Sequence, residues 1–458
     1  MAAGIRVGAL MKKDLKAGML EASNGRFQVR AEILIVGGGV MGTSIAMHTA
    51  QRTDPISKPV VLFEKRDLGS GSSGHSGAIL RQHYAEPVVA RMARHSLREY
   101  AGFEARTGRS LGFRRTGVLT LAGAETPDLC ERLRANVEML KGLGVETELV
   151  EETEIQELVP GIEVKLGTIA AWEPDGGFVD PDKTISAFAA LGRASGAVTR
   201  LGAEVQKILV ENGKVVGAET SEGPYTANKI CVVAGPWSAG LLRPLGLNFP
   251  LRTIRPESHF VVMRDSDLLD EDLEDEAIGP REALSFDDIQ DPIERAAEST
   301  ARASLGLHPV VVDLEQSFYM RCEPNQRRTR LGRVDYDHDE VVENPDMLKE
   351  EVSQELIDWT RRALERRMPT YADQPDAGSQ ASMYTITPDA QALIGTVPGI
   401  EGLSIVTGFS GHGFKLAPVI GAGVAQMLMD ERITTFDAEF FTPTRFKGGE
   451  AFDGRFGF

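Results

Sequence analysis

The run V-G-G-G-V-M-G at residues 36–42 constrains the fold of this chain more than any other feature of the sequence. It sets Gly37, Gly39 and Gly42 in a G-x-G-x-x-G pattern directly after the short apolar run 33–36. Glycines are needed where a tight turn joins a strand to a helix and the backbone must approach a pyrophosphate closely. The amino end of that helix also offers N–H groups to a phosphate. The run therefore predicts a dinucleotide site in a β-α-β unit.

A second apolar run, at residues 60–63, ends in Glu64, which lies 22 residues beyond Gly42. A carboxylate there can accept hydrogen bonds from both ribose hydroxyls of an adenosine, and it disfavours a 2′-phosphate. The alternative is a glycine-rich turn with an incidental surface glutamate. The glycines do not distinguish NAD from FAD. The serine- and glycine-rich loop that follows Glu64 favours FAD, because it suits a cofactor that stays bound and extends past its pyrophosphate.

The 458-residue chain carries a formal net charge of −17, and no basic run compensates for it. Nucleic acid and anionic membrane surfaces are therefore poor partners, because like charges repel. The uncharged run 33–50 has three adjacent glycines and polar residues in its second half, which favour a strand, a turn and a buried helix over a transmembrane segment. These observations point to a protein that binds a small molecule.

The cysteines are scattered and odd in number, with no C-x-x-C pair: Cys130, Cys231 and Cys322. Neither a disulfide framework nor a zinc site is indicated, and we expect no metal. A reducing, cytoplasmic location fits best. The N-terminus is basic but has no continuous apolar core, which argues against a secretory signal and leaves a mitochondrial presequence as the alternative.

Periodicity and turn residues predict further elements. Two helices begin at Pro87 and Pro127, and residues 203–235 form a β-meander with a turn at Asn212 and Gly213. A long charged helix is predicted over residues 347–368 and ends before a proline.

The segment 264–308 is strongly acidic and has little sustained periodicity. We interpret it as an insertion. A solvated excursion is favoured, and a lid or a docking element for a homo- or hetero-oligomer is the alternative.

Two C-terminal runs make the glycine pattern specific: M-Y-T-I-T-P-D at 383–389 and T-G-F-S-G-H-G-F-K at 407–415. With them the chain resembles the FAD-dependent D-amino-acid-oxidase superfamily, and within it the sarcosine oxidase and dimethylglycine dehydrogenase branch. The resemblance covers about residues 31–430. It implies an α/β fold with a discontinuous Rossmann-type FAD-binding domain and a second, substrate domain on a mixed or antiparallel sheet.

The resemblance also implies domain boundaries. The FAD-binding domain takes residues 31–112, 176–246 and 379–442, and the substrate domain takes 113–175 and 247–378, with the acidic insertion inside it. Residues 1–30 are then an N-terminal extension and 443–458 a C-terminal tail. Residues from several of these segments are expected to contact FAD: Gly37, Gly39, Gly42, Glu64, Lys65, Ser73, Gly74, His75, Ser76, Gly77, Val205, Gly235, Trp237, Gly408, Gly411, His412, Gly413 and Phe414.

The substrate site follows from the same resemblance. In sarcosine oxidases, residues matching Arg81 and Lys415 hold the substrate carboxylate, and tyrosines matching Tyr319 and Tyr384 line the cavity. A surface ion pair is the alternative for Arg81, and buried core positions are the alternative for the tyrosines. Two cations that converge on a carboxylate fix one end of a substrate, so that a C–H bond can point at the flavin.

Two departures from the family pattern bear on catalysis. Arg330 stands where sarcosine oxidases place a lysine that helps to activate oxygen, and Val334 stands where they place a substrate-contacting histidine. We assign Arg330 and Lys415 as catalytic residues. Because an arginine is bulkier and its charge more delocalised, fast reaction with oxygen is in doubt, and the pocket is expected to be larger or more apolar than sarcosine requires.

The attachment of the flavin is open at this point. His75 can be aligned with a histidine that dimethylglycine dehydrogenases join to the flavin 8α-methyl, but the tryptophan of that segment is replaced by Gly74. Ser382 stands where other relatives carry a cysteine that links the flavin, which excludes a thioether. We expect non-covalent FAD, with a bond through His75 as the alternative.

The residues favour an FAD-dependent oxidoreductase that removes a hydride from the carbon beside the nitrogen of a small secondary or tertiary amino acid, such as an N-methyl amino acid, whose imine then hydrolyses. Whether oxygen accepts the electrons is open. A 2-hydroxy-acid or D-amino-acid dehydrogenase is the first alternative; the former needs a base, for which His83, His259 and His412 are the candidates. A non-catalytic flavoprotein assembly factor, or the catalytic subunit of a hetero-oligomeric dehydrogenase, are the others.

Overall fold

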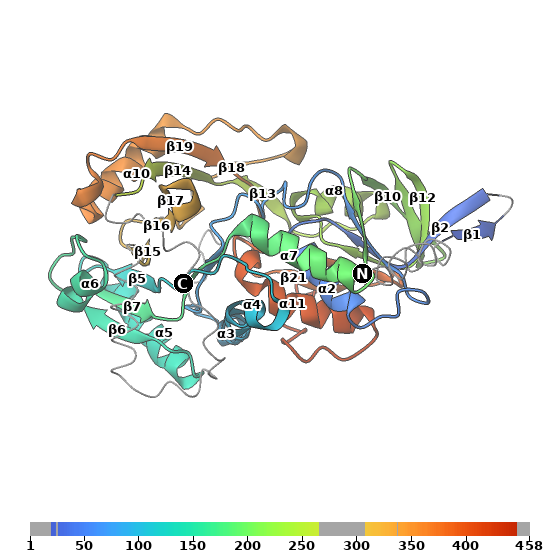
Figure 1. Cartoon of the computed structure of the whole chain (residues 1–458), viewed down its shortest axis with the longest axis horizontal. Helices are drawn as coiled ribbons and strands as arrows, with labels where there is room; N and C mark the ends of the chain where they lie inside the picture. Colours follow the sequence, from blue (N-terminus) through green and yellow to red (C-terminus); the bar gives the residue numbers. More distant parts are fainter. Residues whose placement is uncertain (1–19, 24–25, 265–306, 337, 447–458) are drawn as a thin grey trace, which may run out of the picture.

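The computed structural model describes residues 20–23, 26–264, 307–336 and 338–446. The acidic insertion predicted at 264–308 and the terminal segments predicted at 1–30 and 443–458 lie mostly outside these residues. Two large sheets organise the described part of the chain, and Figure 1 shows them at opposite ends of the molecule.

Within the described residues, nine strands form the first sheet. Its parallel centre follows the order β22-β12-β2-β3-β9, and Ile33 pairs with Val60 where β2 and β3 meet. Apolar residues on both faces of these strands explain the order, because parallel strands are covered on both sides. The strands are β2 (Arg26–Val36), β3 (Val60–Glu64), β9 (Val198–Leu201), β12 (Gly223–Val232) and β22 (Leu403–Thr407).

The predicted meander is confirmed. Strand β10 (Val205–Glu211) pairs antiparallel with β11 (Lys214–Thr220), and β11 pairs antiparallel with the first part of β12. Asn212 and Gly213 take φ angles of 50° and 75° in the connecting turn, as a tight hairpin requires. Two further strands pair antiparallel with β2 and β22, namely β1 (Leu20–Ser23) and β21 (Leu393–Thr396).

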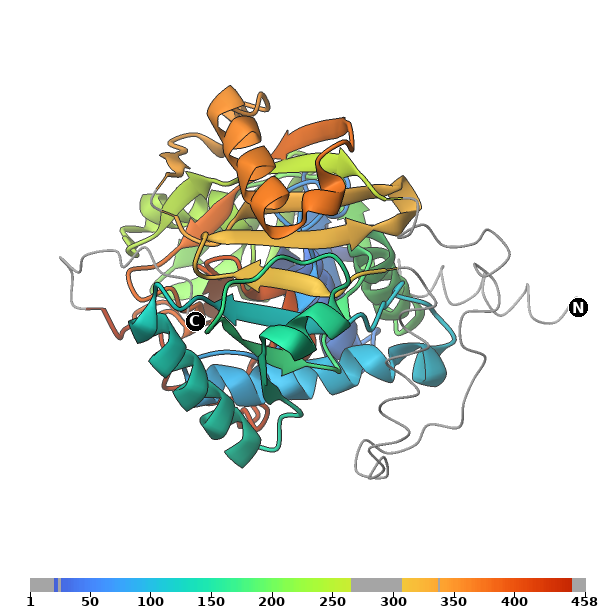
Figure 2. The same cartoon turned by 90° about the vertical axis from the view of Figure 1, so that its left-hand side faces the viewer.

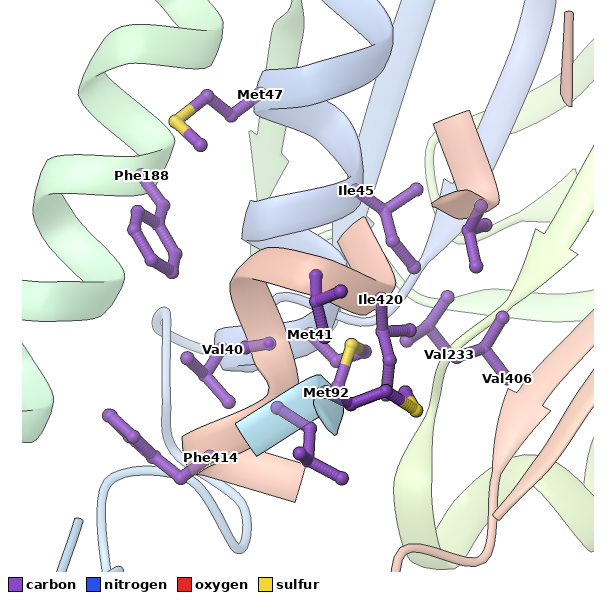
Figure 3. Packing of buried hydrophobic residues seen from close by; sticks show 14 of the residues in the cluster. Val40, Met41, Ile45, Met47, Met92, Phe188, Val233, Val406, Phe414 and Ile420 are labelled. Atoms are coloured by element: carbon purple, nitrogen blue, oxygen red, sulfur yellow. The ribbon is translucent and has the colours of Figure 1, made fainter. Parts of the chain in front are cut away.

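Four helices and one face of this sheet share a single hydrophobic cluster. Figure 3 shows Ile45, Met92, Phe188 and Ile420, one from each helix, with Val233, which directly follows β12, beside Ile420. Packing of these side chains, rather than local helix propensity, holds the layer together. The helices are α2 (Val40–Ala50), α3 (Pro87–Ala101), α7 (Pro181–Ala194) and α11 (Gly413–Leu428).

Helices α2 and α11 come from opposite ends of the sequence and cross closely. The Ser44 hydroxyl donates to the carbonyl of Ala417 at 2.8 Å, 373 residues away along the chain. A Cβ added to Gly421 would lie 2.2 Å from the Ser44 Oγ, so the crossing requires a glycine there.

The second large sheet has eight strands in the described residues, in the order β19-β14-β17-β16-β15-β5-β7-β6. Only β15 and β5 pair parallel, so the sheet is mixed, as expected. In Figure 2, α10 lies over the strands of this sheet. Its strands are β5 (Val118–Ala122), β6 (Glu148–Glu151), β7 (Ile169–Glu173), β14 (Glu257–Val262), β15 (Val310–Asp313), β16 (Phe318–Glu323), β17 (Arg328–Arg333) and β19 (Asp376–Ala381).

Smaller elements position the site. A three-stranded sheet, β18-β13-β20, carries Tyr384, and the two-stranded pair β4·β8 leads into Arg81. The remaining elements are β4 (Ile79–Leu80), β8 (Gly177–Phe178), β13 (Arg252–Arg255), β18 (Glu340–Val341), β20 (Tyr384–Ile386), α4 (Phe103–Thr107), α5 (Pro127–Gly142), α6 (Glu152–Leu158), α8 (Ser238–Leu242) and α10 (Gln354–Arg367).

The predicted helix 347–368 is wrong at its amino end. Helix α10 begins at Gln354, because the Ser353 hydroxyl accepts from the Leu356 N–H and caps it there. The charged residues before Ser353 extend the pattern but not the helix. Strand β2 likewise begins at Arg26, inside the predicted N-terminal extension. No described helix is long and apolar enough to cross a membrane.

Candidate active site

A cavity of about 450 Å³ lies at the carboxyl ends of the parallel strands of the first sheet. Its walls include Val36 at the end of β2, Glu64 at the end of β3 and Val406 in β22, and it reaches the first turn of α11. Ligands of doubly wound sheets bind at this edge, where the strand ends and helix amino termini meet. The cavity therefore stands where the glycine pattern predicts a dinucleotide.

The glycines fit a close approach of the backbone to a ligand. A Cβ on Gly42 would lie 1.9 Å from the carbonyl oxygen of Gly37, and a Cβ on Gly37 would lie 2.4 Å from that of Val233. A Cβ on Gly39 would lie 2.9 Å from the Ser73 Oγ. Gly37 and Gly42 thus admit no side chain, and a side chain at Gly39 would displace the Ser73 hydroxyl, so the backbone itself forms this wall of the cavity.

Glu64 and Ser73 hold the rim of this cavity. The Glu64 carboxylate accepts from the N–H of Gly38 at 2.8 Å and from that of Arg66 at 2.9 Å. The Ser73 hydroxyl accepts from the Val40 N–H at 3.1 Å, in the first turn of α2. Both side chains therefore shape the predicted phosphate and ribose positions by binding the backbone around them.

A residue that the sequence did not suggest connects segments of the two predicted domains at this rim. Asp346 accepts from the Trp237 Nε1 at 3.0 Å and pairs with Lys65, whose ammonium lies 4.3 Å above the Trp237 ring. The Arg66 Nη2 also lies 3.0 Å from the Asp346 Oδ1. No local pattern marks this aspartate, which stands in a short 3₁₀ turn far along the chain.

The structure brings most of the predicted cofactor residues to this cavity. Thirteen of them line it: Gly37, Gly39, Glu64, Lys65, Ser73, Ser76, Val205, Gly235, Trp237, Gly408, Gly411, Gly413 and Phe414. His75 and Gly77 instead line a second cavity. Gly42, Gly74 and His412 line neither, although Gly42 and Gly74 support the turns through close backbone contacts.

The second cavity has a volume of about 270 Å³ and shares Tyr384 with the first. Tyr319 and Arg330 also line it, so the predicted substrate tyrosines and the predicted catalytic arginine meet there. The Tyr319 hydroxyl lies 3.5 Å from the Ser258 Oγ. A cavity that adjoins the cofactor cavity through one tyrosine is a natural place for part of a substrate.

Arg330 is buried, and its charge is paired. Its Nε donates to the Glu323 carboxylate at 2.7 Å, and its other nitrogens donate to Ser258, Gln380 and the carbonyl of His75. Burial raises the pKa of Glu323, but the charge of Arg330 and its neighbours outweighs burial and lowers it to about 2. The carboxylate is therefore ionised at neutral pH, and Arg330 offers no unpaired charge.

Arg81 and Lys415 lie together in a buried cluster. Arg81 is 5% exposed, donates to the carbonyl of His83, and places its guanidinium carbon 4.3 Å from the Tyr84 ring centre. Lys415 makes no hydrogen bond or ion pair with any described residue. Burial and then the charge of Arg81 lower the pKa of Lys415 well below its usual value.

Glu173 completes this cluster and was missed at the sequence level. Its Oε1 accepts from the Gln82 N–H at 2.8 Å, and its Oε2 has no hydrogen-bond partner among the described residues. Burial raises the pKa of Glu173 to about 7, although Arg81 counters this. Burial therefore leaves Lys415 with a lowered pKa and Glu173 with a raised one, and an anion bound beside Arg81 and Lys415 would favour the charged form of the lysine.

The three candidate bases for a hydroxy acid are not brought together. Burial lowers the pKa of His83, His259 and His412 alike. His259 bonds to Thr360 and Asp376, away from both cavities. No group of three or more metal-ligating side chains occurs among the described residues.

A cavity bounded by glycines, at the carboxyl ends of parallel strands and at a helix amino terminus, defines a dinucleotide-binding protein with a Rossmann-type domain. Beside it, the mixed sheet carries Tyr319, Arg330 and Arg333 to the second cavity. The chain belongs to the family of FAD-dependent oxidoreductases, whose family model matches residues 32–427. FAD is accordingly its cofactor, and the glycine-lined cavity fits it.

Individual relatives agree with this assignment. The chain is 25% identical over 421 residues to the peroxisomal sarcosine oxidase of Homo sapiens, covering 91% of this chain and 96% of that protein. It is 24% identical over 442 residues to the 4-methylaminobutanoate oxidase (formaldehyde-forming) of Paenarthrobacter nicotinovorans, covering 96% of this chain and 48% of that longer protein. Among solved structures it shares the fold of L-proline dehydrogenase from P. horikoshii, with a TM-score of 0.76, 23% identity and coverage of 92% and 99%.

We expect the flavin to be held without a covalent bond. His75 lines the second cavity, and burial, then Arg330, lower its pKa. Gly74, where dimethylglycine dehydrogenases carry a tryptophan, has no room for a side chain, since a Cβ would lie 2.5 Å from the Gly69 carbonyl. Acid precipitation should therefore release all flavin into the supernatant. Flavin that stays with the pellet, and leaves it in His75→Ala, would show the covalent bond instead.

Proposed function

We propose that this protein oxidises the C–N bond of a small secondary or tertiary amino acid, of the N-methyl type, whose carboxylate is held by Arg81 and Lys415. The observation that carries the proposal is the Lys415 ammonium, which has no hydrogen-bond or ion-pair partner among the described residues and lies beside Arg81. A buried cation of this kind is costly unless an anion offsets it.

The position of this pair supports the assignment. Gly413 and Phe414 line the cofactor cavity, and Lys415 follows them directly in the first turn of α11. A carboxylate bound between Lys415 and Arg81 would therefore lie next to the part of the cavity wall that Gly413 and Phe414 form. Charge-assisted hydrogen bonds from two cations would fix that end of the substrate.

FAD, when bound, supplies the hydride acceptor. The chain orients the substrate: Arg81 and Lys415 hold the carboxylate, and Tyr319 and Tyr384 form the wall between the two cavities. We assign no side chain as a base, because a neutral amine can release hydride without one. The three histidines that are candidate bases for a hydroxy acid are buried, and burial lowers their pKa values.

Arg330 supports a slow reaction with oxygen. The family's lysine at this position presents a compact charge. In Arg330, by contrast, all three guanidinium nitrogens donate hydrogen bonds, and Nε lies 2.7 Å from the Glu323 carboxylate. Its positive charge is thereby neutralised locally. This favours an electron acceptor other than oxygen.

The function is tested by flavin reduction in the absence of oxygen. We expect N-methyl amino acids to bleach the flavin, and the corresponding 2-hydroxy acids to leave it oxidised. Each acid is compared with its decarboxylated amine, which lacks the group that Arg81 and Lys415 bind. Equal reduction by the acid and by the amine would contradict an amino-acid substrate.

A further inference from the structure

The second cavity is lined by more acidic than basic side chains, and most of its basic groups are already engaged. Arg255 is 6% exposed and donates to the Glu257 carboxylate and to two backbone carbonyls. Glu257 also accepts from the hydroxyl of Ser353 at 2.7 Å. Arg330 is paired with Glu323, and the Arg333 guanidinium carbon lies 4.0 Å from the centre of the Trp359 ring.

Two partly buried carboxylates in this cavity, those of Asp335 and Asp339, have no ion-pair partner among the described residues. The Asp335 Oδ1 is buried and has no hydrogen-bond partner among the described residues. The Asp339 side chain makes no hydrogen bond or ion pair with any described residue. Burial, and then the neighbouring charge of Asp335, raise the pKa of Asp339 to about 7. A cation placed between the two would relieve both the burial and the repulsion.

An independent feature of the same cavity points to a ligand with hydrogen-bonding groups. Ser382 lines the cavity and is 7% exposed, and its Oγ has no partner among the described residues. A buried hydroxyl without a partner costs free energy, so a donor or acceptor is expected to satisfy it.

The surroundings of Tyr336 relate the position of these acceptors to that of Arg81 and Lys415, which we call the carboxylate clamp. The Tyr336 hydroxyl donates to the carbonyl of Ser410, and its ring lies edge-on to that of Tyr384, with 6.3 Å between the centres. Asp339 and Arg81 both lie close enough to Tyr336 to act on its pKa, which Asp339 raises and Arg81 lowers. Asp339 and Arg81 therefore both lie near Tyr336, on the side of the second cavity that adjoins the cofactor cavity through Tyr384.

We propose that Asp335 and Asp339 bind a second, cationic group of the substrate, so that the preferred substrates are N-methylated amino acids with a positively charged side chain. The inference rests on the proposed function. The carboxylate is held by Arg81 and Lys415, the reacting amine lies at the cofactor cavity, and the side chain passes Tyr384 into the second cavity. Asp335, Asp339 and Ser382 then accept hydrogen bonds from its ammonium group.

The test compares two acids of similar shape by anaerobic flavin reduction: Nα-methyl-lysine, and N-methyl-2-aminoheptanoate, in which a methyl group replaces the side-chain ammonium. We expect the parent protein to reduce with Nα-methyl-lysine at least tenfold more efficiently, measured as the reduction rate constant divided by Kd. Asp335→Asn and Asp339→Asn should each remove most of this preference and leave reduction by the neutral acid nearly unchanged.

Glu340→Gln is the matched control, because Glu340 is exposed at the rim of the same cavity and the change removes the same charge. It should keep the preference. Equal reduction of the parent by both acids would overturn the inference and leave the proposed function standing. A preference that survives in both aspartate variants would also overturn it. Reduction by neither acid, nor by any other N-methyl amino acid, would instead contradict the proposed function.

Discussion

Replacing Gly39 with valine is expected to give protein that purifies without flavin. A Cβ at this position lies 2.9 Å from the Ser73 Oγ, and the further methyl groups of valine would occupy the space where the pyrophosphate approaches the backbone. Ser73 also accepts from the Val40 N–H, so its displacement would disturb the first turn of α2. The ratio of flavin absorbance to protein absorbance at purification measures the effect.

Gly142→Val serves as the control. Gly142 ends α5, and a Cβ there would meet nothing within 4 Å, so the same substitution should leave flavin content unchanged. Circular dichroism shows whether Gly39→Val keeps its fold. A folded Gly39→Val protein with a full complement of FAD would contradict the assignment of this cavity to the cofactor.

Removing the guanidinium in Arg81→Ala is expected to weaken binding of an amino-acid substrate by about 2 to 4 kcal/mol, which is roughly 30- to 1,000-fold in Kd. The loss is large because the carboxylate would stay buried with one of its two cations gone. Lys415→Met should produce a loss of similar size. Flavin content should be unchanged, since neither residue lines the cofactor cavity. Anaerobic titration of flavin reduction gives the Kd.

Arg81→Lys should restore binding only in part, because an ammonium cannot form two parallel N–H bonds to a carboxylate. Arg91→Ala is the control: Arg91 lies exposed on α3, and its loss should not change the Kd. If Arg81→Ala bound the acid and its decarboxylated amine with the same ratio as the parent, the clamp would be excluded.

The parts of the structure that could be predicted are those encoded by neighbouring residues. Gly37, Gly39 and Gly42 reveal the strand, turn and helix because the constraint on each lies within a few residues of the chain. The turn at Asn212 is local in the same way. The predicted start of the long helix was wrong for a local reason too, since a single hydroxyl, that of Ser353, decides where α10 begins.

The parts that could not be predicted depend on residues far apart in the sequence. Glu173 acts on Arg81 and Lys415 only because β7 ends beside them, and Asp346 reaches Trp237 across 109 residues. Tyr336 and Asp339 stand in a loop without periodicity. In the sequence, charged residues at such positions cannot be told apart from ordinary solvent-exposed residues. Only the fold shows that they lie at a cavity.

The crossing of α2 and α11 affects when this protein can acquire its cofactor during synthesis. The Ser44–Ala417 hydrogen bond and the glycine at 421 join the first helix of the sheet to the last, and the cavity takes walls from both ends of the chain. While the ribosome is still translating the middle of the message, the nascent polypeptide has only half of this site. The complete cavity therefore forms only after the chain has been synthesised at least as far as Phe414.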